Sequence, residues 1–156
     1  MKKVFLSLLL QAIISNNLIL AHCQIPCGIY DDALRIIILK ENFQTIKKSM
    51  EQIVKLSNQS DALSKNQITR WITTKEYHSQ NVQKIISEYF LTQRINESDE
   101  SYIDKTTLLQ KLLVISMKCK QTVDTKHIEE AIILIEKFSK LYFDKHDFNH
   151  LMELSD

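Results

Sequence analysis

Residues 31–53 read DDALRIIILKENFQTIKKSMEQI, and the large apolar side chains of this segment recur at alternating intervals of three and four positions. That period places them on one face of an α-helix, and Asp31 or Asp32 supplies a suitable N-cap. The predicted inward positions are Ile36, Leu39, Phe43, Ile46, Met50 and Ile53. We expect a helix that ends near Ser57 and turns this face towards a core.

Three further segments repeat this helical period. A polar connector at residues 58–61 precedes the first of these three segments, and another at residues 96–101 follows it. Their predicted inward positions are Ile68, Trp71, Lys75, His78, Val82, Ile85 and Tyr89, then Leu108, Leu112, Ile115 and Cys119, then Ile128, Ala131, Ile132, Ile135, Phe138 and Tyr142. Short connections favour antiparallel neighbours. We therefore expect an all-α, up-down antiparallel four-helix bundle over residues 31–143, and a C-terminal tail at residues 144–156 that frays.

The composition agrees with long helices in a single domain. The 156 residues include one glycine and one proline, the two residues that interrupt helices most strongly. Twenty Lys and Arg residues balance 19 Asp and Glu residues, so the formal net charge is +1. A balanced charge lacks the basic excess of nucleic-acid-binding proteins, and we expect no nucleic acid as a partner.

The first 21 residues have the order of a targeting segment. Lys2 and Lys3 precede an apolar run, and Ala21 is a small residue suited to a cleavage site. The run is too short to span a membrane, so we expect a cleaved leader at residues 1–21 and no membrane association afterwards. Its order favours export to the periplasm or outside the cell. The alternative is an N-terminal helix that is buried or lies at an interface.

Residues 22–30 read HCQIPCGIY and contain the one proline and the one glycine, together with two of the three cysteines. After cleavage behind Ala21, His22 offers its α-amine and its imidazole, Cys23 its amide nitrogen and thiolate, and Cys27 a second thiolate. Pro26 and Gly28 supply the turn that brings Cys27 back. Two nitrogens and two sulfurs in a plane suit Ni(II) or Cu(II). In an exported protein, a Cys23–Cys27 disulfide without metal is the alternative.

The pattern His-Cys-x-x-Pro-Cys-Gly-x-Tyr at residues 22–30 resembles the N-terminal nickel hook of the nickel superoxide dismutase family. Residues 87–94 (SEYFLTQR) and 117–122 (MKCKQT) are also similar to stretches of that family, and the resemblance extends from residue 22 to about residue 143. It implies one nickel ion per chain, held by His22, Cys23 and Cys27. It further implies a cis Ile25–Pro26 bond, a pocket for small anions gated by Tyr30, and a homohexamer of four-helix bundles.

The activity implied by the resemblance is the conversion of superoxide to oxygen and hydrogen peroxide, with nickel cycling between Ni(III) and Ni(II). Two other functions stay open: a secreted helical binding protein with a Cys23–Cys27 disulfide, and a nickel-binding protein without catalysis. Some family members carry propeptides that are removed in the cytoplasm, which gives a second possible location.

Two polar residues interrupt the second apolar face, and the resemblance places one of them near the metal. Some family members brace the histidine ligand with a glutamate and an arginine, at positions that correspond to Ile38 and His78 in this chain. Lys75 and His78 therefore have two interpretations. They either lie solvated at an imperfect seam between helices or face the hook and its pocket.

Overall fold

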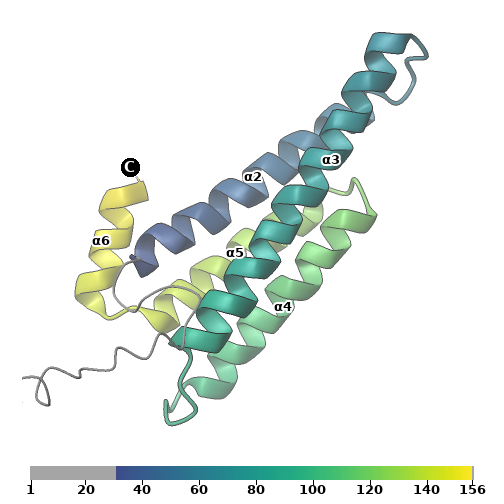
Figure 1. Cartoon of the computed structure of the whole chain (residues 1–156). Coiled ribbons are helices and arrows are strands. Elements are labelled where there is room, and N and C mark those ends of the chain that lie inside the picture. Colours follow the sequence, from purple (N-terminus) through teal and green to yellow (C-terminus); the bar gives the residue numbers. More distant parts are fainter. Residues whose placement is uncertain (1–30, 156) are drawn as a thin grey trace, which may run out of the picture.

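The computed structural model describes residues 31–155, and all its regular elements are helical (Figure 1). In chain order the helices are α2 (Asp32–Leu56), α3 (Ala62–Lys84), the π-helix η1 (Ile85–Arg94), α4 (Tyr102–Gln121), α5 (Lys126–Tyr142) and α6 (Lys145–Ser155). Helix α2 packs on α3 and α5, and α4 packs on α3 and α5, which closes an antiparallel four-helix core. The predicted all-α bundle is confirmed. None of the described helices is both long and apolar enough to cross a membrane.

Helix α2 begins where the sequence predicts. The Oδ1 atom of Asp31 accepts hydrogen bonds from the backbone N–H groups of Ala33 at 2.7 Å and Leu34 at 3.2 Å, so Asp31 is the N-cap. Five of the six predicted inward side chains of α2 are completely buried, namely Ile36, Leu39, Phe43, Ile46 and Met50. The apolar face of this helix therefore forms one wall of the core.

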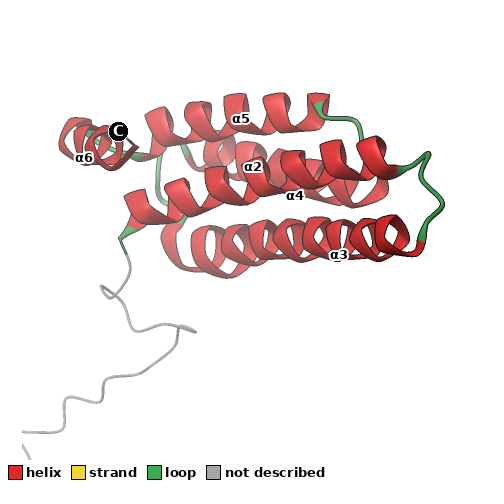
Figure 2. Cartoon of the chain, turned by 90° about the horizontal axis from the view of Figure 1, so that it is seen from above, coloured by secondary structure: helices red, strands yellow, loops and turns green. Residues whose placement is uncertain are grey.

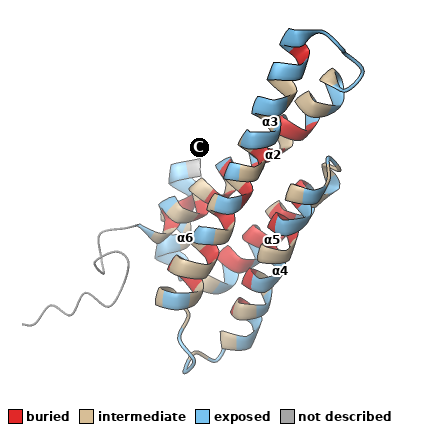
Figure 3. Ribbon diagram, turned by 45° about the vertical axis from the view of Figure 1, so that its right-hand side comes forward, coloured by how far each residue is buried: buried red, intermediate tan, exposed pale blue. Residues whose placement is uncertain are grey.

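The hairpin of α2 and α3 projects beyond the ends of α4 and α5 (Figures 1 and 3). Ile53, Ile68 and Trp71 lie towards this projecting end and are only partly buried. The helical period predicts which face a residue occupies, but it does not predict where the neighbouring helices stop. For this reason these three predicted core positions are less buried than the rest of the face.

The second apolar face changes its winding at Ile85, where α3 passes into η1. In a π-helix the hydrogen bonds join residues five apart. Side chains follow this spacing too, since Thr92 Oγ1 donates to the carbonyl of Ser87 at 2.6 Å and Gln93 Nε2 donates to that of Glu88 at 2.7 Å. The altered winding buries Ile86, Tyr89 and Phe90. Ile85, a predicted inward position, is only partly buried.

The inner faces of α4 and α5 agree with the predicted positions in most cases. Leu112, Ile115, Cys119, Ile128, Ala131, Ile135 and Phe138 are buried, whereas Leu108, Ile132 and Tyr142 are partly buried and pack against the core. Cys119 is a free thiol in the core, and burial raises its pKa to about 11. At neutral pH this thiol is protonated, which fits a packing role.

The C-terminal segment differs from the expectation of a fraying tail. Residues Lys145–Ser155 form α6, which lies beside the start of α2 at one end of the bundle (Figures 1 and 2). Asp144 accepts a hydrogen bond from the backbone N–H of Asp147 at 2.9 Å, and Leu151 is only 2% exposed. The sequence prediction was wrong because so short a helix buries too few side chains to show a clear period.

Candidate metal centre

The predicted metal ligands and their surroundings lie outside the described residues. This applies to His22, Cys23 and Cys27, to Pro26 and Gly28 of the turn, to the Ile25–Pro26 bond, to the cleavage position at Ala21 and to Tyr30. The ligand set and the role of Tyr30 therefore stay predictions from the sequence. The structure does describe the point where residues 22–30, here called the hook, join the bundle, because Asp31 follows Tyr30 directly and caps α2.

The carboxylate of Asp32, in the first turn of α2, is the centre of a polar cluster at this junction. It accepts hydrogen bonds from Tyr89 Oη, from Arg94 Nε at 3.0 Å and from Tyr142 Oη at 2.6 Å. Arg94 also donates from Nη2 to Tyr89 Oη at 2.9 Å. These four side chains, the Asp32 cluster, come from α2, η1 and α5. The cluster therefore joins η1 and the end of α5 to the first turn of α2.

The π-winding of η1 is what brings two members of the cluster together. Tyr89 and Arg94 are five residues apart, which is the separation of hydrogen-bonded residues in a π-helix. An ordinary α-helix places residues three or four apart on one face instead. The same winding sets the Arg94 guanidinium over the ring of Tyr89, with Cζ 4.8 Å from the ring centroid.

Both tyrosines of the cluster are neutral hydrogen-bond donors at physiological pH. Burial, reinforced by the hydrogen bond to Asp32, raises the pKa of Tyr89 to about 12. The same two causes raise the pKa of Tyr142. A phenol that stays protonated can keep donating to the carboxylate, so the cluster keeps its hydrogen bonds across the neutral range.

The other carboxylate at the junction is bound from α6. His150 Nε2 lies 2.8 Å from Asp31 Oδ2, while Asp31 Oδ1 caps α2. The hydrogen bond with His150 is the largest of the effects that lower the pKa of Asp31. Both residues that follow the hook are thus held by side chains from distant parts of the chain.

Lys75 is buried within the bundle, with 4% of its surface exposed, so it is not solvated at a seam. Its Nζ donates to the backbone carbonyls of Cys119 at 2.8 Å, of Thr122 at 3.4 Å and of Lys120, at the end of α4. This ammonium group therefore completes the C-terminal turn of a neighbouring helix.

His78 lies one turn further along α3 and is paired with α2. Its Nδ1 is 2.8 Å from Oδ1 of Asn42, whose Nδ2 donates to the carbonyl of Ile38 at 2.7 Å. Burial lowers the pKa of His78. Asn42 is ten residues beyond Asp32, or about 15 Å along the helix axis. A contact of Lys75 or His78 with the hook remains a prediction, because the hook lies outside the described residues.

Sequence reasoning missed the polar contacts of this region, namely those of Asp32 with Tyr89, Arg94 and Tyr142, of Asp31 with His150, and of Asn42 with His78. Asn42 could have been found, since it is a polar residue beside the predicted apolar face of α2. Tyr89 and Tyr142 each end an apolar face, and a buried tyrosine needs a partner for its hydroxyl. The identity of that partner depends on how the helices pack.

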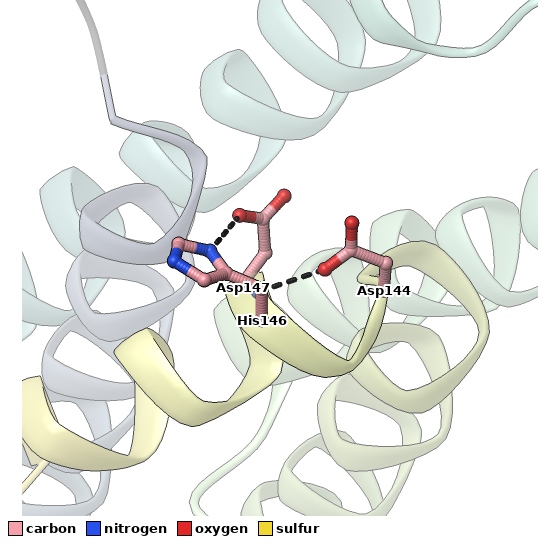
Figure 4. Close-up of side chains that lie close together, drawn as sticks. All are labelled: Asp144, His146 and Asp147. Carbon is pink, nitrogen blue, oxygen red and sulfur yellow. Dashed lines mark hydrogen bonds and ion pairs between the residues drawn. The ribbon is translucent and has the colours of Figure 1, made fainter.

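A second group of potential metal ligands lies at the start of α6 (Figure 4). One ligand atom each of Asp144, His146 and Asp147 lies within 4.8 Å of the others, and all three residues are exposed. Asp144 is occupied as the cap of α6, and His146 Nδ1 lies 3.3 Å from Asp147 Oδ1. This arrangement is that of a capped helix start, where the helix dipole disfavours a cation.

The fold and the junction define an all-α bundle whose first helix continues from an N-terminal segment rich in nitrogen and sulfur donors. A sequence model of the nickel-containing superoxide dismutases matches residues 17–146, which include the hook and nearly all of the bundle. The chain belongs to the nickel-containing superoxide dismutase family and is an oxidoreductase. No curated protein and no solved structure matches it. Most of α6 lies beyond the matched residues.

Proposed function

We propose that the hook of this nickel superoxide dismutase becomes its metal site after cleavage behind Ala21. The observation that carries the proposal is the donor set of residues 22–30, which falls inside the family match. Thiolates together with amine, amide and imidazole nitrogens suit nickel rather than the hard cations. The ligands would be His22, Cys23 and Cys27, with one nickel ion per chain.

The reaction consumes two superoxide anions and two protons and yields one oxygen and one hydrogen peroxide. Nickel, when bound, would supply the one-electron chemistry by alternating between Ni(III) and Ni(II). The anionic thiolates of Cys23 and Cys27 and the deprotonated amide of Cys23 would hold the metal and favour its higher oxidation state. The same thiolates are open to oxidation by the peroxide produced beside them. Tyr30 would restrict the pocket to small anions and limit that damage.

The free α-amine of His22 is essential to this proposal, because a residue retained before it turns the amine into an amide. The test compares protein that begins at His22 with protein that retains Ala21. We expect the extended form to bind little nickel in the native manner and to lose superoxide-decay activity. A matched control carries a removable extension, and its removal should restore both properties. Full activity in the extended form would overturn the proposal.

Mass and metal analysis distinguish the two alternatives. A mature protein two hydrogen atoms lighter than its sequence and free of metal would indicate the Cys23–Cys27 disulfide of a binding protein. A protein that holds nickel but leaves the decay of superoxide unchanged would be a passive nickel binder. The proposed enzyme contains about one nickel per chain and accelerates the decay.

We further propose that the mature protein is exported and assembles as a homohexamer. The leader-like order of residues 1–21 supports export, and membership of the family supports the assembly. Cell fractionation with detection of the mature N-terminus tests the location; accumulation of mature protein in the cytoplasm contradicts export. Sedimentation of the nickel-loaded protein tests the assembly, and a monomer at micromolar concentration contradicts it.

A further inference from the structure

The adjacent carboxylates of Asp31 and Asp32, at the start of α2, are bound by side chains from three separate elements. Tyr89 and Arg94 of η1 and Tyr142 of α5 bind Asp32, and His150 of α6 binds Asp31. In Figure 1 these elements converge at the start of α2. One peptide bond separates Asp31 from Tyr30, so this pair is the described part of the chain that lies nearest to the hook in the sequence.

Capping of α2 does not require this arrangement. Asp31 Oδ1 already satisfies the N–H groups of Ala33 and Leu34. An aspartate in the first turn needs no partner, because the helix dipole alone favours its charge. Asp32 nevertheless receives three donors, one of them a guanidinium whose planar geometry also fixes Tyr89. The cluster therefore constrains the orientation of the first turn more tightly than helix formation demands.

The helix α6 adds a second restraint from a different direction. Leu151 is buried against the bundle, and its neighbour His150 is thereby held beside Asp31. Residues 147–155, which include His150 and Leu151, lie beyond the residues that the family model matches. The first turn of α2 is thus fixed on one side by η1 and α5 and on another by α6.

We propose that Asp31 and Asp32 are positioning residues: they fix the first turn of α2, from which the hook continues, and so support the reaction at the proposed nickel site. The inference rests on the proposed function of the hook. Catalytic rates are sensitive to misplacement on the scale of 1 Å, where losses reach about 100-fold. Loosening the pair should leave the predicted nickel ligands intact and lower the rate of the reaction.

The experiment uses the full chain, processed to begin at His22, with substitutions that weaken the restraints one at a time. Tyr142→Phe removes one donor to Asp32, Arg94→Lys keeps the charge but loses the bridge to Tyr89, and His150→Ala releases Asp31. Two control variants are matched by position. Asp104→Asn alters an exposed first-turn aspartate of α4, and His146→Ala alters an exposed histidine of α6.

Three readouts are taken on each variant: nickel per chain, the rate of superoxide decay, and the electron paramagnetic resonance spectrum of the oxidised nickel site. We expect the test variants to keep the nickel content of the parent, to lose roughly 10-fold or more in rate, and to give a broadened or shifted spectrum. The controls should match the parent in all three. Parent-like rates and spectra in Tyr142→Phe, Arg94→Lys and His150→Ala together would overturn the proposal.

A fourth readout distinguishes a failure of this proposal from a failure of the proposed nickel site in the hook. Hydrogen exchange of the backbone amides of residues 33–36 is measured in nickel-free protein. Faster exchange in the test variants than in the controls supports the restraint, and unchanged exchange overturns it, whatever the metal content. A parent protein that binds no nickel contradicts the proposed function while this measurement still decides whether the restraint exists.

Discussion

The Nζ atom of Lys75 on α3 lies 2.8 Å from the backbone carbonyl oxygen of Cys119, at the last turn of α4. The last carbonyls of a helix have no partner within the helix, and a buried end must find donors elsewhere. Lys75 supplies them from a neighbouring helix, which explains why a lysine occupies a position where the apolar pattern requires a hydrophobic residue. The negative end of the α4 dipole favours its charge.

Replacement of Lys75 by methionine should therefore destabilise the bundle. The change keeps most of the length of the side chain but leaves buried carbonyls of α4 without a donor, at a cost of about 2–3 kcal/mol. Urea unfolding followed by circular dichroism measures the loss. Lys65→Met, at an exposed position of the same helix, is the control and should change the stability by less than about 0.5 kcal/mol. Equal stability of the two variants would contradict the capping role.

His78 should make the stability depend on pH in the weakly acidic range. Burial lowers its pKa from the ordinary 6.5, so the unfolded chain takes up a proton at a higher pH than the folded protein does. Stability is then fully present above about pH 6.5 and decreases as the pH falls through the lowered pKa. Unfolding free energies of the parent and of His78→Gln, measured between pH 7 and 5, should diverge in slope. His146→Gln, at an exposed site, should follow the parent; if His78→Gln does so too, the prediction is wrong.

The ion pair formed by Asp99 and Lys105 should make the stability depend on pH in a more acidic range. Hydrogen bonds from Lys105 and Ser101 lower the pKa of Asp99 from 3.8 to about 2. The folded protein therefore keeps this carboxylate charged where the unfolded chain protonates it. The contribution is complete above about pH 4 and is lost as the pH falls towards 2. Asp99→Asn should show a flatter stability profile in that window. The exposed Glu51→Gln is the control, and a profile of Asp99→Asn that coincides with it would count against the pair.

Leu151 should be the main anchor of α6. It is 2% exposed, whereas Leu154 on the same helix is 43% exposed. Leu151→Ala should cost about 2 kcal/mol or more and increase the proteolytic sensitivity of α6, because it removes buried methyl groups and leaves a cavity. Leu154→Ala should cost only a few tenths of a kcal/mol. Thermal unfolding and limited proteolysis measure both effects, and similar results for the two variants would show that α6 is not anchored in this way.

The helices were predictable where a long apolar face meets a complete partner. Ile36, Phe43 and Met50 of α2 and Ile135 and Phe138 of α5 are buried as their spacing predicts. Prediction was less successful where the geometry is set by packing with distant elements. The period could not reveal the change to π-winding at Ile85, nor the extent of the projecting α2–α3 hairpin, nor the short helix α6.

The candidate site also contains one part that local sequence predicts and another that depends on contacts between distant residues. The prediction of His22, Cys23 and Cys27 as donors needed the sequence alone, because the three residues lie within six positions and chelation by near neighbours depends on local chemistry. The Asp32 cluster was not recognisable, since Tyr89 and Tyr142 are 57 and 110 residues away from Asp32. No local pattern indicates that such residues meet.

The sequence by itself determined the helical class of this protein and the inward faces of its main helices, and it predicts the donor set of the hook. Each of these depends on interactions between residues that are close along the chain. Only the tertiary structure decided which helix ends meet. It therefore assigned Lys75 to the end of α4, His78 to Asn42, and the carboxylates of Asp31 and Asp32 to partners on α6, η1 and α5. Buried polar groups must be satisfied by whatever the packing brings near them, and for that reason their partners can be identified only once the fold is known.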